Sequence, residues 1–225
     1  QTLMFEAEWS KWLGSSYSVF VNSGSSANLL VTLALLCSGR LRNKKVIVPA
    51  ISWVTTVSPA MQLGMTPILC DADKDDLGLD VDHFERLCKE HKPSVAFLVH
   101  VLGHANKMKQ IIEICEKYDV LLVEDTCEAY GSEHRGQKLG TFGIASTHSF
   151  FYGHAMSTIE GGMVSTDDYD LFNLMLSLRS HGWLRDNDEL YRQKILEKYD
   201  MKNKKTYSSL VSLLNTSSKL PFPIE

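Results

Sequence analysis

The sequence predicts an α/β fold with a mostly parallel central sheet flanked by helices. Short apolar runs rich in β-branched residues recur along the chain, and helical patterns separate most of them. This alternation is typical of βαβ units, which form parallel sheets. With 225 residues, 44% hydrophobic and 22% charged, the chain also has the length and composition of a globular protein with a substantial core.

In the first half of the chain, four predicted strands alternate with three helical segments. The strands are short apolar runs, expected at residues 17–21, 45–48, 66–70 and 95–100. A helix rich in alanine and leucine is expected at residues 26–36, and a weakly patterned one at 55–63. An amphipathic helix is expected at residues 81–90. This order of strand and helix is the one that a parallel sheet requires.

The second half continues the pattern as far as residue 179. Apolar residues at helical spacing predict a helix over 107–118, and the apolar run 120–123 predicts a buried strand. Two more strands are expected around 145–151 and 162–165, and a helix near 169–179 follows them. From about Lys202 the sequence is polar and without periodicity, so no core is predicted there.

Charge and cysteine usage exclude several classes of protein. The net charge of −4 gives no electrostatic basis for binding nucleic acid. No apolar run approaches the roughly 18 residues that a membrane span needs. The five cysteines are scattered singly, which argues against a disulfide framework and favours a reducing cytoplasm.

The first segment that could carry chemistry is Asn22–Ala27, between a predicted strand and a predicted helix. Free amides at a helix start, together with serine hydroxyls, suit a phosphate group, and Gly24 allows a tight turn. An ordinary serine N-cap is the alternative. The segment matches neither the Walker pattern nor GxGxxG, so nucleotide-binding loops of those kinds are not predicted.

The second segment is Glu124-Asp125, at the edge where parallel sheets gather their ligands. A carboxylate there can hold a proton on a heteroaromatic nitrogen or bind a metal, and it can also simply cap a turn. The histidines and cysteines lack the spacing of a zinc site, so no metal centre is predicted. Trp53, after another strand, could stack on a flat ring or belong to the core.

The third segment, residues 149–162, combines hydroxyls, aromatic rings, His154 and a double glycine. His154 could act as a general base, because imidazole titrates close to neutral pH. The alternative is a structural histidine held by hydrogen bonds. A Ser-His-Asp hydrolase is not favoured, because the sequence has no GxSxG motif.

Taken together, these segments resemble the DegT–DnrJ–StrS family of sugar aminotransferases, which have fold type I and depend on pyridoxal 5′-phosphate (PLP). The resemblance runs from about Phe5 to Asp186 and keeps the family's order of motifs. The motifs are an opening helix that ends in Trp12-Leu13-Gly14, the turn Asn22–Ala27, and the segments 48–53, 67–71, 99–103, 123–131, 160–164 and 179–182.

The resemblance implies a domain organisation and a cofactor site. Residues 1–200 would form the large PLP-binding domain, incomplete at its N-terminus. Residues 201–225 would be an irregular tail, and the family's small C-terminal domain would be missing. The implied cofactor-binding residues are Gly24, Ser25, Trp53, Asp125, Glu128 and Ser149.

Each of these residues receives a role from the resemblance. Asp125 would keep the pyridine nitrogen protonated, so that the ring can accept electrons. The two residues of the turn, with Ser149, would hold the phosphate, and Trp53 would stack on the ring. Glu128 would lie near the phenolic oxygen, at a position that is often glutamine in the family.

The sequence departs from the family at His154, where aminotransferases have the lysine that anchors the cofactor covalently. No lysine occurs between Lys138 and Lys194, and imidazole forms no stable imine with an aldehyde. A histidine can still act as a base, and a subgroup of the family, the sugar 3-dehydratases, has this substitution. The resemblance thus implies a 4-keto-6-deoxy-sugar 3-dehydratase that uses L-glutamate to form pyridoxamine 5′-phosphate (PMP) and acts on a nucleotide-linked 4-keto sugar.

Two alternatives remain open at this point. A nucleotide-sugar aminotransferase would need another amine in place of the lysine. A non-catalytic, truncated paralogue could keep the fold as a binding module. Because the family builds each active site from two subunits, the resemblance also implies a homodimer.

Overall fold

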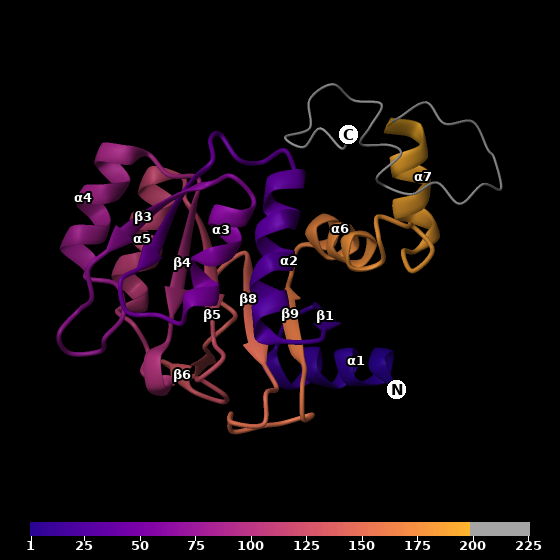
Figure 1. Ribbon diagram of the computed structural model, residues 1–225, viewed down its shortest axis with the longest axis horizontal. Helices are drawn as coiled ribbons and strands as arrows, with labels where there is room; N and C mark the ends of the chain where they lie inside the picture. Colours follow the sequence, from indigo (N-terminus) through magenta and orange to yellow (C-terminus); the bar gives the residue numbers. More distant parts are fainter. Residues whose placement is uncertain (199–225) are drawn as a thin grey trace.

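The computed structural model describes residues 1–198 and confirms the α/β architecture (Figure 1). A seven-stranded sheet forms its centre, in the order β1-β9-β8-β5-β4-β2-β3. The strands are β1 (Tyr17–Val21), β2 (Lys45–Pro49), β3 (Thr66–Cys70), β4 (Val95–Val99), β5 (Leu121–Asp125), β8 (Ala145–Ser149) and β9 (Gly162–Thr166). The predicted tail at 201–225 lies outside the described residues.

The sheet is parallel from β8 to β3 and antiparallel at one edge. There β9 pairs antiparallel with β8, and β1 pairs antiparallel with β9. The register aligns Val99 with Asp125 and Asp125 with Thr147. The carboxyl ends of the parallel strands therefore meet at one edge of the sheet, where ligands are expected in this architecture.

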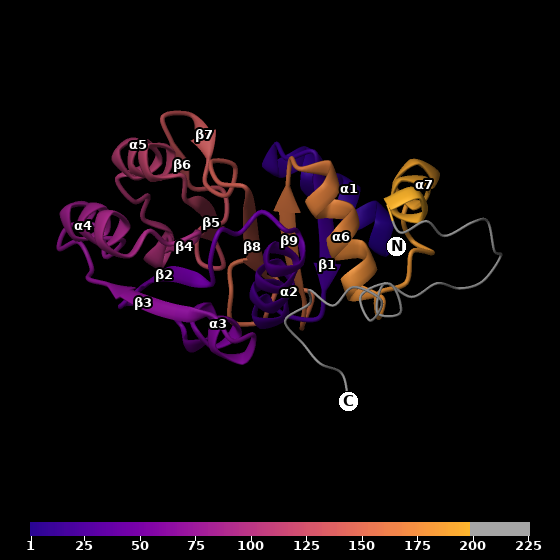
Figure 2. The same ribbon diagram turned by 90° about the horizontal axis from the view of Figure 1, so that it is seen from above.

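Helices cover both faces of the sheet (Figure 2). In chain order they are α1 (Thr2–Leu13), α2 (Gly24–Cys37), α3 (Ser58–Gln62), α4 (Val81–His91), α5 (Met108–Tyr118), α6 (Tyr169–Arg179) and α7 (Glu189–Lys198). In Figure 2, α4 and α5 lie on one side of the sheet, and α2 and α3 lie on the other. None of the helices described is long and apolar enough to cross a membrane.

Strand alternation divides the core between the two faces. Side chains that pack with α4 and α5 include Ile47, Ala96, Leu98 and Leu122. Side chains that pack with α2 and α6 include Val46, Val48, Phe97 and Val123. Because successive residues of a strand point to opposite faces, a strand buried on both sides must be apolar throughout. The continuous apolar runs in the sequence have this origin.

The structure differs from the predicted elements in three places. The segment 55–63 consists of a 3-10 turn, Val54–Thr56, followed by α3, and Pro59 lies in the first turn of that helix, where its missing N–H is tolerated. A small hairpin, β6 (Glu133–His134) with β7 (Gln137–Lys138), and helix α7 were not predicted.

Candidate active site

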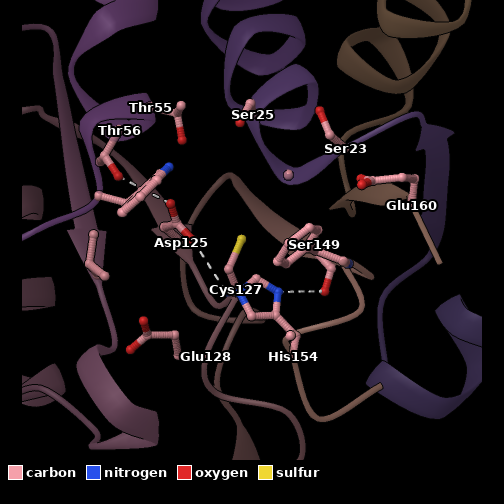
Figure 3. A pocket seen from close by; sticks show the side chains of 15 residues that line it. Ser23, Ser25, Thr55, Thr56, Asp125, Cys127, Glu128, Ser149, His154 and Glu160 are labelled. Carbon is pink, nitrogen blue, oxygen red and sulfur yellow. Dashed lines mark hydrogen bonds between the residues drawn. The ribbon is translucent and has the colours of Figure 1, made fainter. Parts of the chain in front are cut away.

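A pocket of about 570 Å³ opens at the carboxyl edge of the parallel strands, beside the start of α2 (Figure 3). It brings together every residue that the sequence analysis selected: Gly24, Ser25, Trp53, Asp125, Glu128, Ser149 and His154. Residues from four separate parts of the chain therefore meet in one cavity. The other residues that line it are Ser23, Thr55, Thr56, Val99, Cys127, Phe151, Gly153 and Glu160.

The first turn of α2 forms one wall of the pocket. Ser23 is the N-cap, and its side chain accepts a hydrogen bond from the amide of Ser26 at 3.1 Å. The first backbone bond of the helix joins the amide of Ala27 to the carbonyl of Ser23. The amides of Gly24 and Ser25 precede that bond, so the helix itself leaves them available to an acceptor. The segment is thus a serine cap whose next two amides are left without a partner inside the helix.

Two glycines allow this helix start to approach the sheet. A Cβ at Gly24 would lie 2.7 Å from the Cβ of Ser149, at the end of β8. A Cβ at Gly162, the first residue of β9, would lie 2.2 Å from the carbonyl oxygen of Ser23. Any side chain at either position would push the turn away from the sheet. The hydroxyl of Ser149 would then no longer share the pocket with the amides of α2.

Asp125, the last residue of β5, is only 5% exposed and has a fixed orientation. Its Oδ2 accepts hydrogen bonds from the side-chain amide of Asn28 at 3.0 Å and from the hydroxyl of Thr56 at 3.2 Å. Its Oδ1 accepts from the amide of Cys127 at 3.2 Å. Thr147 in turn donates to Oδ1 of Asn28 at 2.8 Å, which fixes the orientation of that amide. The carboxylate thus presents a defined edge to the pocket.

His154 lies in the loop between β8 and β9, and it is half-buried. Its Nδ1 is 3.1 Å from the carbonyl oxygen of Ser149, as the dashed line in Figure 3 shows. The ring of Phe151 meets the imidazole edge to face at 6.0 Å. The histidine therefore has a hydrogen bond to the backbone and also lines the pocket.

Three further lining residues have distinct surroundings. Trp53 is 75% exposed at the pocket, so it is not a core residue and its ring face is available for stacking. Glu128 accepts a hydrogen bond from the amide of Leu102 at 2.7 Å through one carboxylate oxygen. The thiol of Cys127 has a pKa well above its ordinary value, because burial and then the charge of Asp125 disfavour the thiolate. A protonated thiol is a poor nucleophile, in keeping with a packing role.

Several residues of this site were not predicted from the sequence. Asn28 is 1% exposed on the inner face of an otherwise apolar stretch of α2, and a lone amide among alanine and leucine was the available signal. Thr56 lies in the weakly patterned segment 55–63 and Glu160 in the motif segment 160–164, but neither was predicted as a site residue. Within residues 1–198, no group of three or more His, Cys, Asp or Glu side chains is placed to hold a metal ion.

Comparison with known proteins identifies the family. A family model described as the DegT/DnrJ/EryC1/StrS aminotransferase family matches residues 1–213. The chain therefore belongs to this family of PLP-dependent nucleotide-sugar dehydratases and aminotransferases.

Its relatives include enzymes of both kinds. The chain is 39% identical over 188 residues to GDP-4-keto-6-deoxy-D-mannose 3-dehydratase of Yersinia pseudotuberculosis, covering 82% of this chain and 48% of the relative. It is 34% identical over 178 residues to GDP-perosamine synthase of Escherichia coli O157:H7, covering 79% and 48%. The chain thus spans about half the length of the curated relatives that it matches.

Solved structures agree with these relatives. Escherichia coli GDP-4-keto-6-deoxy-D-mannose 3-dehydratase with bound hydrated PLP superimposes with a TM-score of 0.76 at 34% identity, over 84% of this chain and 49% of that chain. A second structure of GDP-4-keto-6-deoxymannose 3-dehydratase, which contains a trapped PLP-glutamate geminal diamine, gives the same values. These matches confirm the predicted fold type I of PLP-dependent enzymes.

Proposed function

We propose that this chain is the cofactor-binding part of a PLP/PMP-dependent 3-dehydratase that acts on a nucleotide-linked 4-keto-6-deoxy sugar. The observation that carries the proposal is His154, which shares the pocket with Asp125, while no lysine among residues 1–198 lines it. An aminotransferase of this family needs a primary amine there, and the part of the chain that the structure describes places none in the pocket. The 39% identity to a GDP-4-keto-6-deoxy-D-mannose 3-dehydratase supports the same choice.

The polar groups and the aromatic ring that line the pocket fit PLP and PMP. The free amides of Gly24 and Ser25 suit the phosphate, and the hydroxyl of Ser149 can join them. That hydroxyl accepts a long bond of 3.4 Å from the amide of Phe151, so its proton remains free to donate. The carboxylate of Asp125 suits a protonated pyridine nitrogen, and the exposed face of Trp53 suits a flat ring.

When bound, the cofactor would supply an amine that condenses with a keto group and a ring that stores the electrons released by proton removal. The chain would hold and move protons around it. Asp125 would keep the pyridine nitrogen protonated, held in orientation by Asn28 and Thr56. His154 would take the proton from the carbon next to the amine and, once protonated, could return a proton to the reacting group. L-Glutamate is the proposed amino donor, since a solved relative holds it joined to PLP.

The test is an absorbance titration of the purified chain with PLP, followed by excess L-glutamate and then by a GDP-linked 4-keto-6-deoxy sugar. We expect a PLP band that moves to the PMP position with glutamate, and release of ammonia with the sugar. His154→Asn should retain PLP binding and lose ammonia release by about 10²–10⁴-fold.

The other outcomes separate the alternatives. An amino sugar formed without ammonia would indicate an aminotransferase. Absence of PLP binding by a folded chain would favour a non-catalytic binding module. Either result would contradict the dehydratase proposal.

We also propose that the working unit is a homodimer in the reducing cytoplasm. Large apolar side chains are exposed around the pocket, which is unusual for a surface that faces only water: Ile51, Trp53, Val54, Tyr152 and Ile159. All five cysteines are free thiols, as a reducing compartment requires. Sedimentation equilibrium tests the assembly, and a monomer at micromolar concentration would contradict it.

A further inference from the structure

The hydrogen bonds around His154 determine which ring nitrogen carries the proton. A carbonyl oxygen can only accept, so Nδ1 must donate its proton to the carbonyl of Ser149, 3.1 Å away. In a neutral imidazole the other nitrogen, Nε2, then carries the lone pair. Within residues 1–198, Nε2 makes no hydrogen bond, and it lies on the opposite side of the ring from Ser149 (Figure 3). The neutral side chain is thus arranged to accept a proton at Nε2.

The accepting carbonyl is itself held by a second donor. The hydroxyl of Tyr130 donates to the same carbonyl oxygen of Ser149. The two donors use both lone pairs of that oxygen, so it has no place for a competing one. The ring of Tyr130 packs against Trp9 at 5.9 Å and Phe150 at 6.1 Å, and burial raises the pKa of its phenol. Tyr130 is therefore a fixed donor throughout the neutral pH range.

We propose that Tyr130 and the carbonyl of Ser149 are positioning groups that keep neutral His154 in its Nδ1–H tautomer, with Nε2 as the basic atom. This inference rests on the proposed role of His154 as the base. A ring turned over about its Cβ–Cγ bond would place a carbon against the carbonyl and lose the hydrogen bond. The arrangement therefore fixes the tautomer and the ring orientation together, in the manner of other histidine bases whose second nitrogen is held by an acceptor.

His100 provides an internal reference with the opposite tautomer. Asn106 accepts from the amide of Leu79 through Oδ1 at 2.9 Å, so its NH₂ group faces the Nδ1 of His100 at 3.2 Å. An NH₂ group can only donate, so this Nδ1 accepts and the proton lies on Nε2. That proton is donated to Glu124 at 3.1 Å. The same molecule thus holds two neutral histidines in opposite tautomers.

The experiment is a long-range ¹H–¹⁵N correlation spectrum of the full chain, labelled with ¹⁵N-histidine and free of cofactor. The spectrum is recorded at a pH about two units above the ordinary imidazole pKa of about 6.5, which favours neutral rings. Loss of signals in His154→Asn and His100→Asn assigns the two rings. We expect the Nδ1–H pattern for His154 and the Nε2–H pattern for His100. An Nε2–H pattern, or equal populations of the two tautomers, at His154 would overturn the proposal.

A matched pair of variants tests the part played by Tyr130. Tyr130→Phe should lower the Nδ1–H population of His154 and reduce kcat about 2–10-fold, with PLP affinity unchanged. Tyr118→Phe removes a hydroxyl that bonds Glu85, far from the pocket, and should change neither. An unaltered tautomer in folded Tyr130→Phe contradicts its positioning role. Should that variant not fold, the wild-type spectrum alone decides the proposal.

The outcomes also separate this inference from the proposed function. A chain with the expected tautomer that fails to bind PLP contradicts the proposed function alone. A chain that converts PLP with glutamate while His154 carries its proton on Nε2 contradicts this inference alone.

Discussion

Glu124 and Asp125 are neighbours at the end of β5, yet their surroundings are opposite. Glu124 is fully buried, and its carboxylate accepts from His100 and from the backbone amides of Gly140, Phe142 and Gly143. Asp125 accepts three hydrogen bonds of its own and still lines the pocket. We call the first environment the sealed side of β5 and the second its open side.

Strand geometry accounts for the difference. Successive side chains of a strand point to opposite faces, so two adjacent carboxylates cannot share one environment. On the sealed side Glu124 accepts three hydrogen bonds from the turn after the β6–β7 hairpin and a fourth from His100. On the open side one edge of Asp125 remains for a ligand. In an acidic pair at a strand end, one carboxylate can therefore stabilise the fold while the other serves the chemistry, and substitutions at the two positions test this division.

The largest effect is expected on the sealed side. Glu124→Ala leaves three backbone amides and the buried Nε2–H of His100 without an acceptor, so we expect a loss of about 3–5 kcal/mol in the free energy of unfolding. Urea unfolding followed by circular dichroism measures it. Glu113→Ala, an exposed carboxylate paired with Lys109, is the control and should change stability by less than about 0.5 kcal/mol. Similar losses in the two variants would contradict the division.

On the open side the expected effect is on activity. Asp125→Asn removes the charge that would hold the pyridine nitrogen protonated, so ammonia release with the sugar substrate should fall about 10²–10³-fold. The amide oxygen can still accept from Asn28 and Thr56, but the bond from the amide of Cys127 is lost, so the free energy of unfolding should fall by about 1–2 kcal/mol. A variant that loses stability as Glu124→Ala does would place Asp125 in the folding network instead.

Acid should lower the free energy of unfolding through a histidine on the sealed side. On that side His148 lies on β8, between Thr126 and Ser146, and burial lowers its pKa from 6.5 to about 3. Below pH 6.5 the unfolded chain gains a proton that the folded chain does not, so stability falls as the pH drops from 6.5 to about 3 and is unaffected above 6.5. The slope is about 1.4 kcal/mol per pH unit, or about 2 kcal/mol by pH 5.

Unfolding curves of the wild type and His148→Gln at several pH values measure this term. The difference between the two chains should shrink as the pH falls through this range. Parallel curves would show that His148 has no part in the acid response.

The smallest effect is expected at the start of α2. Ser25→Ala removes one hydroxyl from the proposed phosphate site and leaves the backbone amide, so PLP affinity should weaken about 2–10-fold. Ser26→Ala, one residue along and outside the pocket lining, should leave affinity unchanged. Fluorescence titration with PLP measures both, and equal weakening by the two changes would argue against a direct contact from Ser25.

The sequence predicted the parts of the molecule that depend on local pattern. The bounds of β1, β3 and α6 are as predicted, because a buried strand or helix has a continuous or periodic apolar signal. Helix α7 was missed because only Tyr191 and Ile195 are buried along its length, one turn apart. The β6–β7 hairpin was missed because strands of two residues are too short to show alternation.

In the candidate site, too, only the residues in local motifs were predictable from the sequence. Motif segments supplied the residues that line the pocket, because each lies at a strand end or a helix start. Their partners were not predictable from any local signal. Asn28 bonds Asp125 across 97 residues of chain, and Thr147 bonds Asn28 across 119. The tautomer of His154 depends on a carbonyl and a tyrosine that only the fold brings together.

The antiparallel edge of the sheet has a consequence for how the chain acquires its shape. Strand β1 is made early, yet its pairing partner is β9, and Val21 meets Gly162 only after 141 further residues have been synthesised. At about 5–20 residues per second, a ribosome takes roughly 7–28 s to supply them. During that interval the start of α2, which follows β1, cannot pack against β9. Such long-range pairing is slow to form, so the proposed phosphate site at the start of α2 should be among the last features of the nascent protein to form.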